Sequence, residues 1–353
     1  MTRYKPIPEY QNLSAAPFSA EHFFAEHFFA EHFFSSIVPL QKPIVIRGFA
    51  SHWPLVQAAQ KTPRDFATYL TRFYTGKKAS ILLGHPDING RFFYNEDMTG
   101  LNYIKGDERL DLFLGRLLEL AEKDVYPAIS IQNVLLNDML PGLVDENKTD
   151  LFPGVEPRLW VGNQATVCAH YDGSDNLACV VAGRRQFILF PPEQVANLYP
   201  GSLNFTPAGT PVSLVDLHNP DFERYPRFKT ALDNAYSAEL NPGDAIFIPM
   251  LWWHHVDSLA KVNGLINYWW NGSSAKETVQ PTPLDSLNMA LLAMRKLTPE
   301  QRNAWRAMFD HYLFKQGVDP ASYIPEQCQY ALGKITPQAE RVLKDHVIER
   351  LKK

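Results

Sequence analysis

The chain has 353 residues, 45% of them hydrophobic and 12% aromatic, so it can bury the core of one large or two ordinary domains. A formal net charge of −4 argues against broad affinity for nucleic acids or membranes. No signal sequence or apolar run of membrane-spanning length is visible, and the three cysteines form no CxxC pair. We therefore expect a cytoplasmic protein without a disulfide framework, a nucleic-acid partner or a membrane anchor.

The N-terminal part, residues 1–125, mixes helix and strand patterns and predicts an α/β extension. Residues 20–34 are three copies of Ala-Glu-His-Phe-Phe, with histidines at 22, 27 and 32. A five-residue repeat fans these side chains around a helix axis, which indicates a duplicated helix rather than a shared metal site. We expect a turn at Trp53-Pro54, and the periodicity predicts further elements at residues 43–49 (strand), 64–74 (helix), 79–83 and 91–94 (strands) and 108–122 (helix).

Short apolar runs separated by turn residues fill positions 126–275 and are typical of an all-β barrel or sandwich. Prolines and polar residues at about 200–235 predict an insertion near the barrel mouth.

After residue 275 the pattern becomes helical. Thr298-Pro299-Glu300-Gln301 predicts a capping box, and Thr336-Pro337 predicts the start of another helix. Residues 276–353 are therefore expected to form a helical appendage. Its apolar face either covers the barrel or joins two chains, because amphipathicity does not identify the partner.

A candidate metal site centres on His170-Tyr171-Asp172, which lies between two strand-like runs. The alternation of a strand would point His170 and Asp172 to one face. His254 or His255 offers a third ligand. These two neighbours face opposite ways in a strand, so we expect one to bind and the other to be packed or hydrogen-bonded. Two histidines and one carboxylate are the facial ligand set of non-haem iron(II) oxygenases.

Three stretches that carry this pattern are AHYDGSDNLACVVAGRRQFILFPPEQ, NPGDAIFIPMLWWHHVDSL and NYWW. Together they resemble the JmjC-type, cupin-like dioxygenases, and in particular the asparagine hydroxylases of that family. The resemblance implies a mainly β fold: a double-stranded β-helix (cupin jelly-roll barrel) with its core at residues 126–275. It further implies iron(II) held by His170, Asp172 and His254, 2-oxoglutarate as cosubstrate, and a homodimer formed through the C-terminal helices as one option.

The far carboxylate of 2-oxoglutarate needs a cation inside the barrel, and arginine offers a two-pronged donor. The resemblance implies that Arg185 stands where the related hydroxylase has a lysine, and we expect Arg184 to face solvent. It also implies that Asn176, Asn267 and Trp269 line the cosubstrate pocket.

Two positions depart from the family pattern. A family threonine is replaced by Val167, although Thr166 is adjacent, and a family tyrosine is absent from residues 129–133. Gln132 or Ser130 is the candidate replacement for the tyrosine.

The resemblance implies an oxygenase that hydroxylates a protein or peptide side chain. A JmjC-like demethylase or a small-molecule oxygenase would use the same site. A metal-binding cupin of another chemistry and a non-catalytic binding module are alternatives of different classes, because fold does not decide function. The substrate stays open to a protein, a peptide or a small molecule.

Overall fold

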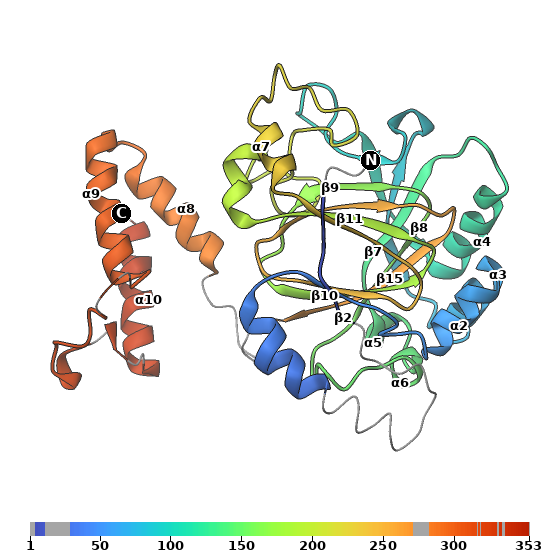
Figure 1. Cartoon of the computed structure of the whole chain (residues 1–353), viewed down its shortest axis with the longest axis horizontal. Coiled ribbons are helices and arrows are strands. Elements are labelled where there is room, and N and C mark those ends of the chain that lie inside the picture. Colours follow the sequence, from blue (N-terminus) through green and yellow to red (C-terminus); the bar gives the residue numbers. More distant parts are fainter. Residues whose placement is uncertain are drawn as a thin grey trace. The chain divides into compact units, whose positions relative to one another are not determined.

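The computed structural model describes residues 4–10, 29–270 and 282–352, except residues 316, 318, 330, 331, 334 and 335. The chain forms two compact units, Met1–Lys276 and Glu277–Lys353 (Figure 1). The described part of the first unit contains all the strands. A search of the described residues finds no helix with the length and apolar character needed to cross a membrane.

The larger sheet contains nine strands within the described residues, in the spatial order β2-β3-β13-β10-β15-β8-β7-β4-β6. In chain order they are β2 (Glu9–Tyr10), β3 (Ile44–Ile46), β4 (Lys78–Gly84), β6 (Tyr103–Arg109), β7 (Ala128–Leu135), β8 (Arg158–Gly162), β10 (Asp175–Ala182), β13 (Ala245–Ile248) and β15 (Asn263–Trp270). Strands β2 and β3 extend one end of this sheet and β4 and β6 the other. The N-terminal region therefore continues the sheet of the β-rich core at both ends.

The smaller sheet contains six described strands, in the order β1-β12-β11-β14-β9-β5. They are β1 (Lys5–Pro6), β5 (Arg91–Phe92), β9 (Thr166–His170), β11 (Arg185–Phe190), β12 (Tyr236–Leu240) and β14 (Trp253–Ser258). Strand β14 is antiparallel to both of its neighbours, β11 and β9.

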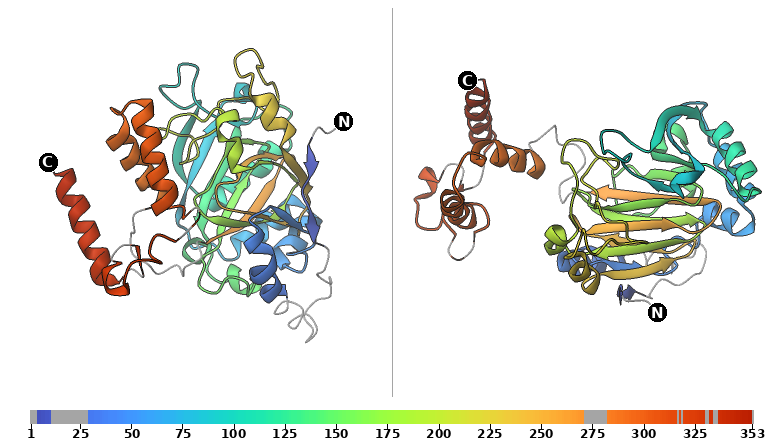
Figure 2. Two further views of the ribbon diagram at one scale, coloured as in Figure 1. Left: turned by 60° about the vertical axis from the view of Figure 1, so that its left-hand side comes forward. Right: turned by 90° about the horizontal axis from the view of Figure 1, so that it is seen from above.

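From β8 to β15 the chain passes repeatedly between the two sheets, which Figure 2 shows from two further sides. Their facing sides share one apolar cluster, in which Ala178, Val180 and Ile246 of the larger sheet pack with Phe187 and Leu189 of the smaller. Two sheets wound in this way are the cupin jelly roll. The predicted double-stranded β-helix is confirmed.

Helices cover the outer face of the larger sheet: α2 (Pro54–Lys61), α3 (Pro63–Thr71) and α4 (Leu110–Ala121) (Figure 1). Strand β10 is thus covered on both faces, which explains its nearly continuous burial. The expected turn at Trp53-Pro54 was wrong in extent, because Pro54 occupies the first turn of α2, where proline is favoured. Shorter helical segments in this unit are η1 (Phe33–Ile37), η2 (Val38–Leu40), η3 (Pro86–Ile88), α5 (Leu136–Met139), α6 (Leu143–Glu146) and η4 (Pro192–Asn197).

Only the last copy of the Ala-Glu-His-Phe-Phe repeat falls completely within the described residues, and His22 and His27 lie outside them. Phe33 of this copy is fully buried, and its ring contacts those of Phe247 and Phe152 edge-on. This copy therefore contributes to the core of the first unit.

The insertion, residues 200–235, contains one helix, α7 (Phe228–Asp233), within a mostly irregular chain. It is hydrogen-bonded to the end of β9, since the Ser213 amide donates to the Ala169 carbonyl at 2.7 Å. The Thr210 hydroxyl also donates to the Tyr171 carbonyl at 2.7 Å. The insertion thus contacts the chain directly beside His170 and Asp172.

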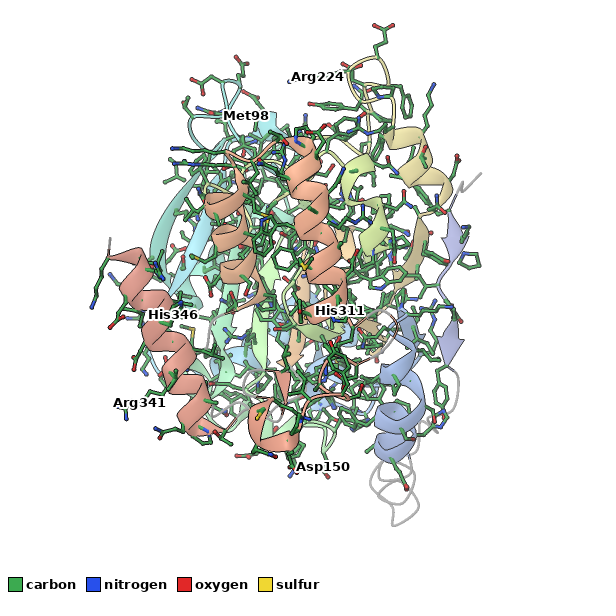
Figure 3. The ribbon with its side chains drawn as sticks, turned by 90° about the vertical axis from the view of Figure 1, so that its left-hand side faces the viewer. Met98, Asp150, Arg224, His311, Arg341 and His346 are labelled. Carbon is green, nitrogen blue, oxygen red and sulfur yellow. The ribbon has the colours of Figure 1, made fainter. Side chains whose placement is uncertain are left out.

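The second unit is helical, with α8 (Pro283–Met294), α9 (Pro299–Tyr312), η5 (Glu326–Cys328) and α10 (Pro337–Leu351). The predicted capping box at Thr298 and Gln301 is present, and Thr336 caps α10. In Figure 3, His311 marks α9, and Arg341 and His346 mark α10.

Candidate metal centre

Three side chains converge where β9 and β14 pair. His170 is the last residue of β9 and lies opposite His254 of β14. Their ring centroids are 4.2 Å apart, and His254 Nε2 lies 3.6 Å from Asp172 Oδ2. One ligand atom from each of the three residues lies within 4.8 Å of the others. The sequence-predicted trio is therefore brought together in a geometry that suits one metal ion.

The side chain of Asp172 is oriented by other contacts than the strand alternation that was expected. Strand β9 ends at His170, so strand alternation does not orient Asp172. Instead, the Leu251 amide donates to the Asp172 carbonyl at 3.0 Å, and the Trp269 indole Nε1 donates to Oδ2 at 3.1 Å. The loop before β14 and the end of β15 therefore position the carboxylate.

Both histidines have the tautomer that a metal needs. His170 Nδ1 lies 2.9 Å from the Cys168 carbonyl, and His254 Nδ1 lies 3.1 Å from the Trp252 carbonyl. Because a carbonyl only accepts, each Nδ1 carries the proton and donates it. Each Nε2 then keeps its lone pair for a metal, and the second hydrogen bond fixes the orientation of the ring.

The electrostatics favour neutral imidazole at this point. Burial lowers the pKa of His170 to about 4, with a further lowering by His254 that Asp172 opposes. His170 is therefore neutral at physiological pH, which is the form that binds metals.

A chain of hydrogen bonds ends at the Asp172 carboxylate. Trp160 Nε1 donates to Asn267 Oδ1 at 2.7 Å, and Asn267 Nδ2 donates to Asn176 Oδ1 at 3.1 Å. The Asn176 amide in turn lies 3.5 Å from Asp172 Oδ2. Asn176, Asn267 and Trp269 thus lie together beside the trio. Trp160 was missed in the sequence, because its link to Asn267 joins residues that are distant along the chain.

Arg185 lies inside the jelly roll. It has the same strand parity as Phe187 and Leu189, whose side chains face the interior. Only 8% of Arg185 is exposed, and its buried Nε has no hydrogen-bond partner. Burial lowers the pKa of Arg185 to about 10, so it remains a cation at neutral pH. Arg184 instead faces outward and pairs with Glu239.

The residues at the two positions that depart from the family pattern lie in different surroundings. The side chain of Val167 packs against the interior apolar cluster. Thr166 donates to Asp257 Oδ1 at 2.7 Å on the opposite face, so it does not replace the family threonine within the pocket. Gln132 is half-buried at a bulge of β7, between the pairs Ile131–Val161 and Val134–Leu159. The strand register at that bulge places Gln132 opposite Trp160.

Comparisons with known proteins identify the family of this chain. Residues 30–276 match the family model described as "Cupin-like domain". Lysine-specific demethylase JMJ31 of Arabidopsis thaliana is 33% identical over a stretch that covers 41% of this chain and 26% of that protein. HSPB1-associated protein 1 of Homo sapiens is 36% identical over 35% of this chain and 28% of that protein. Its Danio rerio homologue is 27% identical over 65% and 52% respectively.

The chain belongs to the cupin-like domain family, because the family model matches well over half of it. Its curated relatives are proteins of the JmjC type, a group of the 2-oxoglutarate oxygenase kind. The chain spans about a quarter to a half of the length of the relatives named above.

Proposed function

We propose that this protein is an iron(II)- and 2-oxoglutarate-dependent oxygenase that hydroxylates a protein or peptide side chain. The observation that carries the proposal is the pairing of two features inside one jelly roll. One is the trio His170, Asp172 and His254 with both Nε2 atoms free to bind. The other is the buried guanidinium of Arg185, whose Nε has no hydrogen-bond partner.

The donor set suits iron(II). Two neutral imidazoles and one carboxylate bind one side of an octahedral ion and leave the other side open to small molecules. With both cofactors bound, the chemistry supplied is insertion of one oxygen atom of O2 into a C–H bond while 2-oxoglutarate loses carbon dioxide and becomes succinate.

The protein itself binds the cosubstrate, excludes water and orients the metal ligands. Arg185 would bind the far carboxylate of the cosubstrate, since its orphaned Nε needs an acceptor in the dry interior. Phe187, Leu189 and Val256 line the same interior and exclude water from it. Trp269 holds the Asp172 carboxylate in place through its indole N–H.

A second candidate is removal of a methyl group from a methylated amine. A relative that is 33% identical over part of the chain is named a lysine-specific demethylase. The same site would hydroxylate the N-methyl carbon, and the product would release formaldehyde. Peptide substrates with and without N-methyl groups distinguish the two reactions by formaldehyde release.

The first test is an anaerobic titration of metal-free protein with iron(II) and then 2-oxoglutarate. We expect a visible metal-to-ligand charge-transfer band in the wild type and none in the His254→Ala variant. His85→Ala is the matched control, because His85 is an exposed histidine that also pairs with an aspartate. Iron binding without a band would point to another cupin chemistry, and no stoichiometric iron binding would indicate a non-catalytic module.

A further inference from the structure

A second histidine–carboxylate group lies on the outer side of the smaller sheet. His254 faces the interior, so its neighbour His255 and also Asp257 face the opposite side of β14. Both are buried, with 3% and 8% of the residue exposed. His255 Nε2 lies 3.3 Å from each of the two Asp257 carboxylate oxygens.

The insertion supplies the third member. His218 Nε2 lies 3.0 Å from Asp257 Oδ1, and the His218 backbone amide is held by Asp216 Oδ1 at 3.0 Å. Ligand atoms of His218, His255 and Asp257 all lie within 4.8 Å of one another. The group thus joins an irregular segment to the barrel through three side chains.

The separations between these atoms suit a tetrahedral ion. Metal–nitrogen and metal–oxygen bonds of about 2.0–2.1 Å place neighbouring ligand atoms about 3.3 Å apart at tetrahedral angles. The observed separations to Asp257 are 3.0 and 3.3 Å. A charge-assisted hydrogen bond from His255 would be shorter, about 2.7–2.9 Å, and would favour one oxygen over the other.

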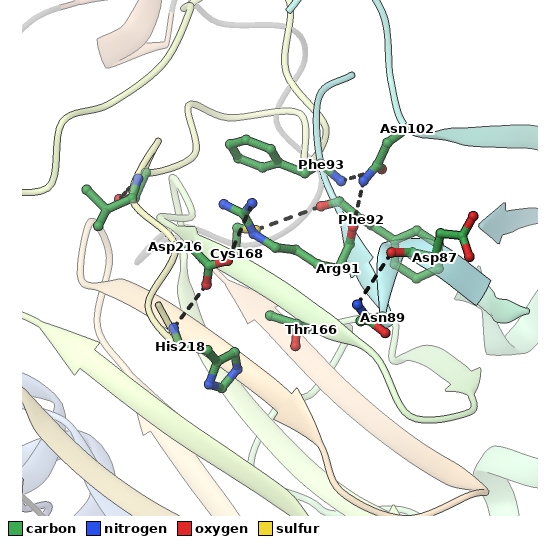
Figure 4. A network of polar contacts seen from close by, with 12 residues as sticks. Asp87, Asn89, Arg91, Phe92, Phe93, Asn102, Thr166, Cys168, Asp216 and His218 are labelled. Carbon is green, nitrogen blue, oxygen red and sulfur yellow. Dashed lines mark hydrogen bonds and ion pairs between the residues drawn. The ribbon is translucent and has the colours of Figure 1, made fainter. Parts of the chain in front are cut away.

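One member of the group, His218, lies at a cavity. A cavity of about 780 Å³ is lined by His218 together with Thr166, Asp216 and Arg91. Figure 4 shows these four residues close together. Arg91 stacks over Phe93 at 3.8 Å from its ring centroid, and its buried Nη2 has no hydrogen-bond partner. His218 is therefore the member of the group that borders the cavity, while His255 and Asp257 are buried.

We propose that His218, His255 and Asp257 form a second metal site, which binds zinc(II) and fastens the insertion to the outer face of β14. Two imidazoles and one carboxylate with a fourth position for water form a recurrent zinc ligand set. Imidazole also disfavours magnesium and calcium, which prefer oxygen ligands. This site is separate from the proposed iron centre, although the two share strand β14.

The test counts zinc per chain. Chelator-treated protein is dialysed against zinc(II), and the bound metal is measured by mass spectrometry. We expect two zinc ions in the wild type, one in His218→Ala, one in His254→Ala and none in the double variant. His85→Ala should keep two. The His218 side chain is 57% exposed, so its removal leaves the fold intact.

Each outcome separates the two sites. If His218→Ala loses one ion and His254→Ala loses no ion, the result supports the second site and overturns the iron centre. Full binding in His218→Ala overturns the second site. Asp172→Ala repeats the measurement if His254→Ala fails to fold.

A second readout follows the insertion itself. In the His254→Ala background, zinc should slow tryptic cleavage after Arg224, an exposed residue of the insertion labelled in Figure 3. Zinc should have no such effect when His218→Ala is added. Equal cleavage rates with and without zinc in the His254→Ala protein would overturn the fastening role.

Discussion

At the scale of single residues, the candidate iron centre depends on side chains that would not touch the metal. Asp172 lies beyond the end of its strand, so its carboxylate is oriented by the indole of Trp269 and the amide of Asn176. Loss of a hydrogen-bond partner of a metal ligand typically lowers metal affinity or activity about 10- to 100-fold.

Trp269→Phe tests this support. The substitution keeps an aromatic ring beside Trp160 but removes the N–H that donates to Asp172. We expect iron(II) affinity to fall roughly 10- to 100-fold, as for other outer-shell partners. Anaerobic titration measures the affinity, and Trp305→Phe, at an exposed site in the second unit, is the control. Unchanged affinity would mean that the loop alone orients Asp172.

Arg185→Met tests the cosubstrate anchor. Hydrogen bonds to a charged group contribute about 1.5–3 kcal/mol, so we expect KM for 2-oxoglutarate to rise roughly 10- to 100-fold. The fold should be retained, because the variant removes a desolvated cation from the interior. Succinate release gives KM, and Arg184→Met, at an outward-facing neighbour, should leave it unchanged. An unchanged KM in Arg185→Met would place the anchor elsewhere.

At the scale of elements, the tight turn between β10 and β11 sets where Arg185 enters the barrel. Gly183 occupies this turn with φ of +70°. A Cβ at this position would overlap the Asn263 side chain and lie 2.5 Å from the Val262 carbonyl oxygen. Glycine is therefore required for both its backbone conformation and its lack of a side chain.

Gly183→Ala should be more destabilising than a matched glycine substitution. At Gly209, φ is +82° and no atom lies within 4 Å of an added Cβ. Gly209→Ala should cost only the backbone strain, about 1–2 kcal/mol. Gly183→Ala adds overpacking of about 1–3 kcal/mol. Urea unfolding measures the free energy of unfolding of both variants. An equal loss of stability in the two would show that the turn relaxes around the methyl group.

The strands and helix starts of this architecture could be predicted from local patterns in the sequence. Alternation predicted the strands of the jelly roll, and the Thr298 capping box gave the start of α9. The convergence of His170, Asp172 and His254 was expected, but the reason for the position of Asp172 was not, because Leu251 in the loop before β14 and Trp269 in β15 orient it from distant parts of the chain. Likewise, no local pattern joins His218 to Asp257, since only the folded insertion brings them together.

At the scale of the whole molecule, the second unit exposes large apolar side chains on all of its long helices. Leu291 and Leu292 on α8, Trp305 on α9 and Ile348 on α10 are each about half exposed, at 47–58%. Surfaces of this kind usually bind another protein. We propose that they join two copies of the chain in a homodimer.

Leu291→Glu should therefore convert a dimer into a monomer, because it buries a charge in the proposed interface. Light scattering coupled to gel filtration measures the mass in solution. Ser286→Glu, at an exposed polar position of the same helix, should leave the dimer intact. A wild-type chain that is monomeric at micromolar concentration would contradict the proposal.

The strand order has a consequence for synthesis on the ribosome. Strand β14 lies between β11 and β9, and β15 lies between β10 and β8, although all four neighbours precede them in the chain. A nascent chain that has not yet emerged past residue 253 therefore has an open slot in each sheet, bordered by unpaired strand edges. The late strands β14 and β15 fill one slot each, and β14 carries His254. The nascent protein thus cannot complete the candidate iron centre before it closes its fold.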